Sequence, residues 1–171
     1  MKARRDHRRL GALLTLALVL MGGMWLDQRG GDTAAAPAPR LPHQDEVTQR
    51  FNQAVVMLHA KEYEHAITAL HRVLMLAPRL PEAHVNMGFA LLGLQRSAQA
   101  RTFFETAIAL RADQANAYYG LALAWDVAGD RAMATGAMRS YLHLARHESP
   151  QHLSRARAAL WEWQADAARH R

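Results

Sequence analysis

The sequence predicts an all-α protein: a solenoid of three helix–turn–helix repeats with a C-terminal capping helix, preceded by a transmembrane helix. Three observations support this fold class. Hydrophobic residues make up 50% of the chain but aromatic residues only 7%, a balance that favours helices over sheets. The chain resembles itself at a period of 34 residues, which is typical of helical repeats. Its N-terminus joins a basic stretch to a long apolar run, the pattern of a targeting or membrane segment.

The formal net charge of +6 is concentrated at the N-terminus. Residues 1–9 contain five lysine and arginine side chains and one aspartate, so the rest of the chain is close to neutral. A folded domain with this ordinary charge balance lacks the basic surface that nucleic acid requires. We therefore expect no nucleic-acid partner, and we interpret residues 1–9 as a cytoplasmic basic flank.

Residues 10–26 form an uncharged run that predicts a transmembrane anchor. Its length is close to the lower limit for crossing a bilayer, and Trp25 lies at its far end, where interfacial aromatic residues are common. The basic flank would stay in the cytoplasm, so the protein is expected in the inner membrane, single-pass, with its domain in the periplasm. A cleaved signal sequence and a helix buried within the protein are the alternatives.

Residues 27–42 are rich in Gly, Ala and Pro, and predict a flexible linker between the anchor and the domain. The chain has no cysteine. That excludes disulfides, thiol catalysis and cysteine-based metal sites.

Residues 43–148 contain the repeat. A shift of 34 residues aligns five columns of equal size class, which are Ala54/Gly88/Ala122, Ala66/Ala100/Ala134, Leu70/Phe104/Met138, Leu74/Ile108/Leu142 and Leu76/Leu110/Leu144. Each unit divides into two helices, with turns expected near residues 61–62, 94–95 and 129–130. The predicted units are 47–80, 81–114 and 115–148.

These units resemble the tetratricopeptide repeat, a 34-residue helix–turn–helix family. The family's small eighth position corresponds to Ala54, Gly88 and Ala122, and its small twentieth position to Ala66, Ala100 and Ala134. The late proline of the family is present only as Pro78, and the aromatic residue at its fourth position only as Tyr118. The first unit is therefore the most divergent.

The small columns have a packing reason, because antiparallel helices approach closely only where one face lacks bulk. We expect Gly88→Leu to be destabilising for this reason. The open end of the stack needs a cap, which residues 149–171 are predicted to form. Ser149 would cap this helix and Pro150 would occupy its first turn, with an inward stripe of Leu153, Ala156, Leu160 and Trp163 and with exposed arginines, Arg155, Arg157 and Arg169.

The resemblance implies a peptide-binding groove formed by the first helix of each unit. Carried over to this chain, its lining residues are Phe51, Asn52, Val55, Leu58, Val85, Asn86, Phe89, Leu92, Asn116, Tyr119, Leu123 and Asp126. Both Asn52 and Asn86 would face the groove. The basic residues with which some family members hold a peptide's carboxyl end are absent, since Phe51, Val85 and Tyr119 stand at the fifth position. An apolar peptide or helix is the expected ligand; alternatively, some of these residues contact the cap helix or the N-terminal segment within one chain.

The sequence offers no catalytic constellation. The chain has ten histidines, but pairs such as His143 and His147, or His65 and His71, lack a third ligand in register. No nucleophile elbow, phosphate-binding loop or dinucleotide fingerprint occurs. We therefore expect no enzyme activity, no metal and no cofactor.

Together these features predict a membrane-anchored adaptor that binds a protein or peptide partner. Small exported repeat proteins of this kind resemble accessory factors of envelope assembly, such as cytochrome c maturation, pilus, secretion or polysaccharide export systems. Among these, resemblance favours cytochrome c maturation. The alternative hypothesis is a structural scaffold that associates with itself.

Overall fold

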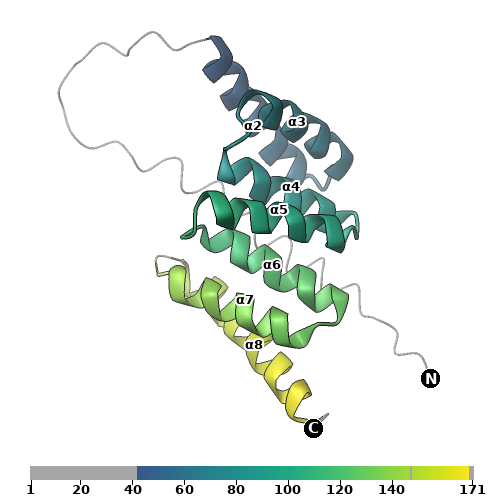
Figure 1. The fold of residues 1–171 in the computed structure, drawn as a ribbon, viewed down its shortest axis with the longest axis vertical. Helices are drawn as coiled ribbons and strands as arrows, with labels where there is room; N and C mark the ends of the chain where they lie inside the picture. The colour runs from purple at the N-terminus through teal and green to yellow at the C-terminus, as the bar shows by residue number, and fades with distance from the viewer. Residues whose placement is uncertain (1–41, 147, 170–171) are drawn as a thin grey trace, which may run out of the picture.

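A computed structural model describes residues 42–146 and 148–169, which are entirely helical apart from the turns (Figure 1). The seven helices of this part are α2 (Pro42–His59), α3 (Tyr63–Leu76), α4 (Pro81–Gly93), α5 (Ser97–Leu110), α6 (Ala115–Ala128), α7 (Arg131–Leu144) and α8 (Pro150–Arg169). The predicted all-α helical repeat is confirmed here. The predicted basic flank, the predicted anchor at residues 10–26 and nearly all of the predicted linker lie outside the described residues.

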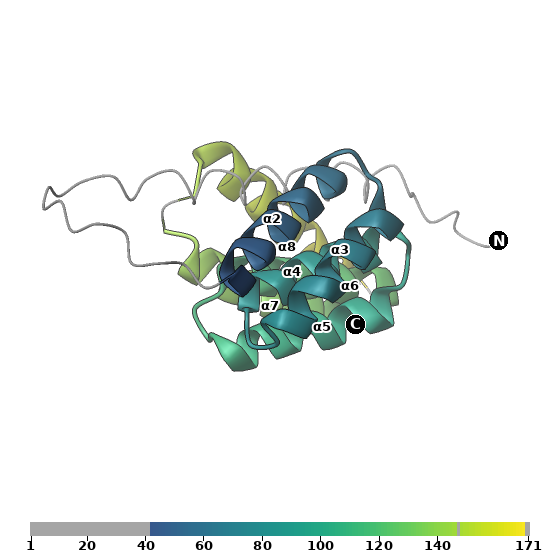
Figure 2. The same ribbon diagram turned by 90° about the horizontal axis from the view of Figure 1, so that it is seen from above.

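Each helix packs against the next one along the chain, so the molecule is a stack that runs from α2 to α8 (Figures 1 and 2). In addition, α2 contacts α4 and α4 contacts α6, whereas α3, α5 and α7 share no comparable contact with one another. The first helices of the three pairs are therefore closer together than the second ones. That difference makes α2, α4 and α6 the inner layer of a curved solenoid.

The turn within each pair uses one left-handed residue at the same repeat position. Lys61 has φ 62° and Gln95 has φ 63°, while Gly129 has φ 84°. This conformation costs about 1–2 kcal/mol for a residue with a Cβ atom, whereas glycine adopts it without steric cost. The third turn therefore has a glycine at its left-handed position, whereas the first two turns have residues for which this conformation is strained.

The second and third units meet around one aromatic ring, that of Phe104 on α5, which is fully buried. A Cβ atom added to Gly88 of α4 would lie 2.6 Å from this ring, and one added to Gly120 of α6 would also overlap with it. Phe89 meets the ring edge-on, with centroids 5.1 Å apart. The packing reason predicted for Gly88 is confirmed, and Gly120 is a second glycine of the same kind that sequence comparison did not single out.

The first unit joins the second through a smaller contact. The ring of Tyr63, at the start of α3, lies over Gly93 at the end of α4, where an added Cβ would overlap with it. Leu58, Ala66 and Ala90 form a small buried cluster nearby, separate from the main core. The first unit also contributes Ala54, Ala69, Leu70 and Val73 to the main core, so the small cluster adds to that contact.

The C-terminal helix α8 begins as predicted. Its first residue is Pro150, and the Ser149 hydroxyl oxygen accepts a hydrogen bond from the His152 backbone N–H at 3.3 Å. Ala156 and Trp163 are buried against the repeats, and the arginines at 155, 157 and 169 are exposed. The predicted inward stripe and exposed face of the cap are both confirmed.

Among the helices of residues 42–146 and 148–169, none has the length and apolar character needed to cross a membrane.

Candidate functional site

The inner layer is where the predicted groove residues lie. In the second and third units, however, five of the large apolar residues predicted to line an open groove are buried, namely Val85, Phe89, Leu92, Tyr119 and Leu123. They form one continuous core together with Ala156 and Trp163 of α8. The structure therefore covers these residues within one chain, as the alternative interpretation expects, and does not place them on an open surface.

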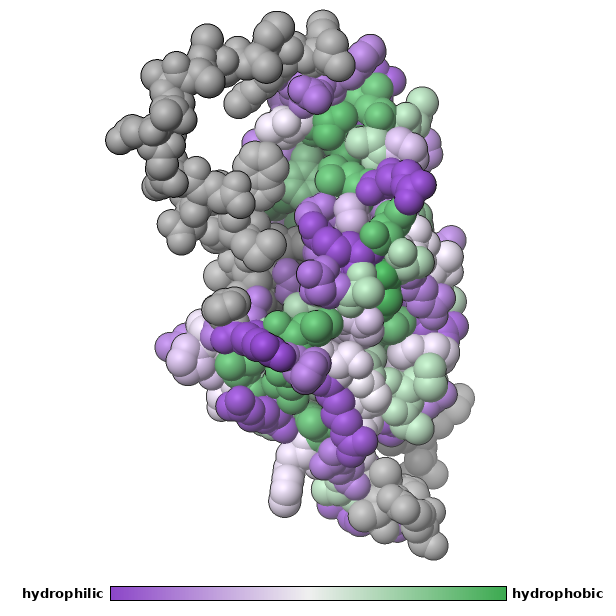
Figure 3. Space-filling view, turned by 60° about the vertical axis from the view of Figure 1, so that its left-hand side comes forward, coloured by the Kyte–Doolittle hydropathy of each residue, from purple (hydrophilic) through white to green (hydrophobic). Residues whose placement is uncertain are grey.

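The first unit is different, because its inner face is partly open. Phe51 and Val55 on α2 are half-buried and Asn52 is exposed, while Leu58 at the end of the helix is buried. Val56, the next residue after Val55, is 67% exposed. Apolar surface is visible on the end of the molecule that α2 and α3 form (Figure 3). Among the apolar residues of the predicted groove, Phe51 and Val55 of this α2 segment are the ones that another molecule can reach.

The two predicted groove amides do not share an environment. Asn86 is fully buried, whereas Asn52 at the same repeat position is exposed. The third member of this column, Gly120, lies against Phe104 of the preceding unit, so the column faces the preceding unit. Because the first unit has no preceding repeat among the described residues, Asn52 stays exposed and Asn86 becomes an interface residue. The prediction that both amides face the groove is wrong for Asn86.

Burial leaves the Asn86 side chain without hydrogen bonds. Neither its amide nitrogen nor its carbonyl oxygen has a partner in the part of the chain that the structure describes. An unsatisfied buried polar group costs about 1–3 kcal/mol. The junction between the first and second units is therefore weakened at its centre.

The third unit contributes polar residues at the end of the inner layer nearest α8. The Asp126 carboxylate lies 3.1 Å from the Arg131 guanidinium. Burial raises the pKa of Asp126, Arg131 lowers it, and Glu162 and Asp166 of α8 raise it further. Asn116, the second residue of α6, is half-buried, and its side-chain oxygen has no hydrogen-bond partner among the described residues. Asp126 and Arg131 therefore lie beside the cap helix, and so they add little to an open surface.

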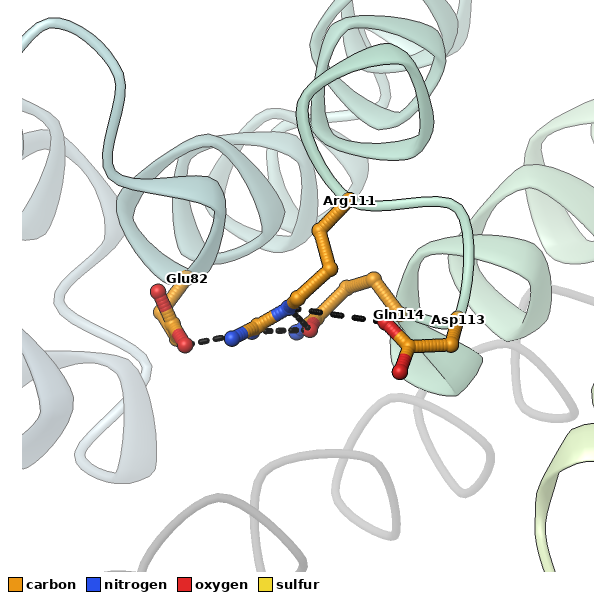
Figure 4. A network of polar contacts seen from close by, with 4 residues as sticks. All are labelled: Glu82, Arg111, Asp113 and Gln114. Atoms are coloured by element: carbon orange, nitrogen blue, oxygen red, sulfur yellow. Dashed lines mark hydrogen bonds and ion pairs between the residues drawn. The ribbon is translucent and has the colours of Figure 1, made fainter.

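A polar network at the junction of the second and third units was not predicted (Figure 4). Arg111, which follows α5, donates hydrogen bonds to Glu82 on α4 and to Gln114, and its Nε lies 4.0 Å from an Asp113 oxygen. Gln114 is buried. The network ties the start of α4 to the loop before α6, so its role is structural. The sequence feature that could have indicated this network is an arginine with an acidic neighbour, Asp113, in the loop between two repeats.

Aromatic burial also shapes this end of the molecule. Tyr119 and Tyr141 contact each other with ring centroids 5.0 Å apart, and burial raises the pKa of both hydroxyls above the ordinary tyrosine value. The Arg101 guanidinium lies 4.0 Å above the Trp125 ring. The tyrosine contact joins α6 to α7 within the third unit, and the Arg101–Trp125 contact joins this unit to the second. Within the described ranges, no three His, Asp or Glu side chains are grouped so that they could hold a metal ion.

Comparison with known proteins agrees with this architecture. Residues 57–125 match the family model of the tetratricopeptide repeat. No curated protein matches the sequence. The Yersinia enterocolitica type III secretion translocator chaperone SycD shares the fold, with a TM-score of 0.69 at 12% identity over 73% of this chain and 88% of that one.

Two solved complexes are also similar. The chaperone PcrH, bound to the chaperone-binding region of PopD, has a TM-score of 0.67 at 19% identity, over 72% of this chain and 95% of that one. The first tetratricopeptide domain of Spaghetti (RPAP3), bound to an HSP90 peptide, has a TM-score of 0.66 at 18% identity, over 72% and 97%. At these identities the likeness shows the fold alone. The family model covers residues 57–125 and the solved structures share the fold, so this part of the chain is similar to tetratricopeptide repeats.

Proposed function

We propose that this protein is an interaction adaptor that binds an apolar peptide or helix of a partner protein on the inner face of α2. The observation that supports this most directly is the half-open row of Phe51 and Val55, which continues the buried apolar row of α4 and α6. An apolar surface of this kind gains binding energy when a partner removes it from water. The exposed Asn52 amide beside it offers a donor and an acceptor to a partner backbone.

The similar structures support this class of function. PcrH is solved with a segment of PopD, and Spaghetti with a peptide of HSP90. In this chain, Phe51, Val85 and Tyr119 occupy the positions at which some family members carry basic residues for a peptide carboxylate. The partner segment is therefore defined by apolar side chains, and a free carboxyl end is not required.

The cellular setting of the proposal comes from the sequence. Residues 10–26 would anchor the chain in the inner membrane, with residues 1–9 in the cytoplasm and the repeats in the periplasm. An adaptor placed there would serve envelope assembly, and we favour cytochrome c maturation among such systems. The linker at residues 27–42 would hold the repeats away from the membrane surface.

Site-specific crosslinking tests the binding surface. The chain has no cysteine, so Val55→Cys and Val56→Cys each provide one thiol, on adjacent residues that point in different directions from α2. Labelled with a maleimide photocrosslinker and activated in the native host, Val55→Cys is expected to give one discrete partner adduct that mass spectrometry can identify. Val56→Cys is the matched control and should not give it. Equal adducts at both positions, or none at position 55, would overturn the binding surface.

Membrane orientation needs a separate test. A reporter active only in the periplasm, fused after Arg171, should be active in the full chain and inactive when residues 10–26 are deleted. Activity of a cytoplasm-only reporter at the same position would contradict the proposed orientation. Loss of haem-stained cytochrome c on gene deletion would support the maturation role, and normal staining would exclude it.

A further inference from the structure

The cap helix α8 has an outward face that the repeats do not cover. Trp161 is 76% exposed, which is the highest exposure of any large hydrophobic residue in the described ranges. Ser154 and Ala158 are exposed and Ala165 is half-buried. At about 100° per residue, Ser154, Ala158, Trp161 and Ala165 fall in one stripe. This stripe lies opposite the buried stripe of His152, Ala156 and Trp163.

We propose that this outward stripe binds a second copy of the chain, so that two α8 helices pair antiparallel about a two-fold axis. The stripe combines one large side chain with small neighbours. In the antiparallel register that places Trp161 of each copy on Ala158 of the other, Ser154 falls opposite Ala165. Each tryptophan then packs on an alanine of the other copy, and small residues face each other at both ends of the contact, which lets the two helices approach closely. A parallel pair would instead place two tryptophans in one layer and two alanines in the next.

Charge supports the same register. Arg155 and Glu162 are seven residues apart and both exposed, so they lie on the same flank of the stripe. A two-fold antiparallel pair brings the same flank of both helices together. Arg155 of each copy then lies beside Glu162 of the other, which gives two equivalent ion pairs. The surface is therefore complementary to itself in shape and in charge.

The pairing is expected to be reversible. One helix face is small compared with the about 800 Å² that each partner buries in a typical stable complex, so we expect a Kd in the micromolar range or above for the detergent-solubilised chain. The dimer would present two α2 surfaces at once, because α8 and α2 lie at opposite ends of the stack (Figure 1). Attachment to a membrane would raise the effective concentration of the second copy; the contact itself does not depend on the anchor or on the α2 surface.

Sedimentation velocity of the full chain in detergent tests the proposal. The wild type should pass from monomer to dimer as its concentration rises, and Trp161→Glu should raise the Kd at least tenfold. The matched control is Val56→Glu, which changes a similarly exposed residue at the opposite end of the stack and should leave the Kd unchanged. A wild type that stays monomeric at all concentrations would overturn the proposal, as would a dimer that Trp161→Glu does not weaken.

Further variants test the register. Arg155→Glu should weaken the dimer, and adding Glu162→Arg should restore it, because the exchanged charges still pair between copies. If the dimer is instead retained by the double variant Arg157→Glu with Glu162→Arg and not by Arg155→Glu with Glu162→Arg, the pair is parallel and the antiparallel proposal is contradicted. Mild oxidation of a chain that carries both Ser154→Cys and Ala165→Cys should give a disulfide-linked dimer, because these two positions face each other between copies, with Val56→Cys as the negative control. Partner adducts at position 55 are a separate measurement, so failure of either proposal can be recognised on its own.

Discussion

The first and second repeat units share one pattern of small and large positions, yet they pack in different ways. In the second unit, helix α4 is almost wholly buried, and the Phe104 ring fills the space above two glycines. In the first unit, α2 is largely exposed: it packs mainly on α3, to which an ion pair between Glu46 and Arg72 also joins it, and less extensively on α4. The same repeat position therefore has a different role depending on whether a neighbouring unit lies in front of it.

This difference explains where a partner can bind. A central unit is enclosed on both sides, so its inner-face apolar residues become core. Among residues 42–146 and 148–169, the first unit has a neighbour on one side only, and Phe51 and Val55 remain half-open. Function in a short solenoid is thus expected at its least enclosed unit, where stability is also lowest.

Leu70 of the first unit and Phe104 of the second occupy the same repeat position. Truncating these residues should have the largest effect on the free energy of unfolding. Phe104→Ala is expected to cost about 3–5 kcal/mol of unfolding free energy, because the glycines beneath the ring have no side chains with which to fill the cavity. Leu70→Ala, at the same position of the first unit, should cost about 2–3 kcal/mol. Urea unfolding measures both. A larger loss for Leu70→Ala would break the contrast between the units.

The glycine under this ring gives the next test. Gly120→Ala should lose about 1–3 kcal/mol by overpacking against Phe104, although alanine favours helix. Gly136 on α7 is also helical but has nothing within 4 Å of an added Cβ, so Gly136→Ala should gain up to about 1 kcal/mol. Opposite signs in urea unfolding are predicted. Stabilisation by both substitutions would show that Phe104 does not rest on Gly120.

A substitution in the turn between α4 and α5 should have a smaller effect on stability, and it should be stabilising. Gln95→Gly should raise stability by about 0.5–1 kcal/mol, because glycine relieves the left-handed backbone conformation at a small entropic cost. Gly129→Ala should lower it by about 1 kcal/mol at the equivalent position. Thermal unfolding of both variants provides the check. A destabilising Gln95→Gly would mean that the side chain of Gln95 makes a contact worth more than the strain.

The smallest effect concerns the exposed pair that holds α2 to α3. The Glu46 carboxylate accepts hydrogen bonds from Arg72 at 2.8 and 3.1 Å, and this hydrogen bonding lowers the pKa of Glu46. The resulting stability is present above the ordinary glutamate pKa and is lost as pH falls through the lowered one. Arg72→Gln should return the Glu46 pKa toward its ordinary value in an NMR titration, with only a slight change in stability. An unchanged pKa would contradict the pairing.

Much of the fold was accessible from the sequence, because each repeat position imposes its size requirement on every unit. The shared small column at Ala54, Gly88 and Ala122 predicted close helix packing, and Ser149 with Pro150 predicted the start of α8. The burial of individual inner-face residues was not accessible in this way. Val55, Phe89 and Leu123 occupy one column, and only their neighbours in space decide which is open.

The Asn86 amide and the Arg111 network show the same limit. Asn86 was predicted in the groove because Asn52 shares its column, but the preceding unit covers only Asn86. Arg111 binds Glu82, 29 residues away along the chain, and the distance between the end of α5 and the start of α4 is a property of the stack that periodicity alone does not give.

The central claim is that the inner face is open only in the first unit, and thiol labelling tests it at one repeat position. Val55→Cys, Phe89→Cys and Leu123→Cys each introduce the sole thiol of the chain. With folding verified by urea unfolding, the thiol at position 55 should react with a maleimide at close to the rate of a free thiol. Those at positions 89 and 123 should react at least about 100-fold more slowly, because the residues that they replace are buried and labelling requires local opening. Equal rates at the three positions would contradict the account.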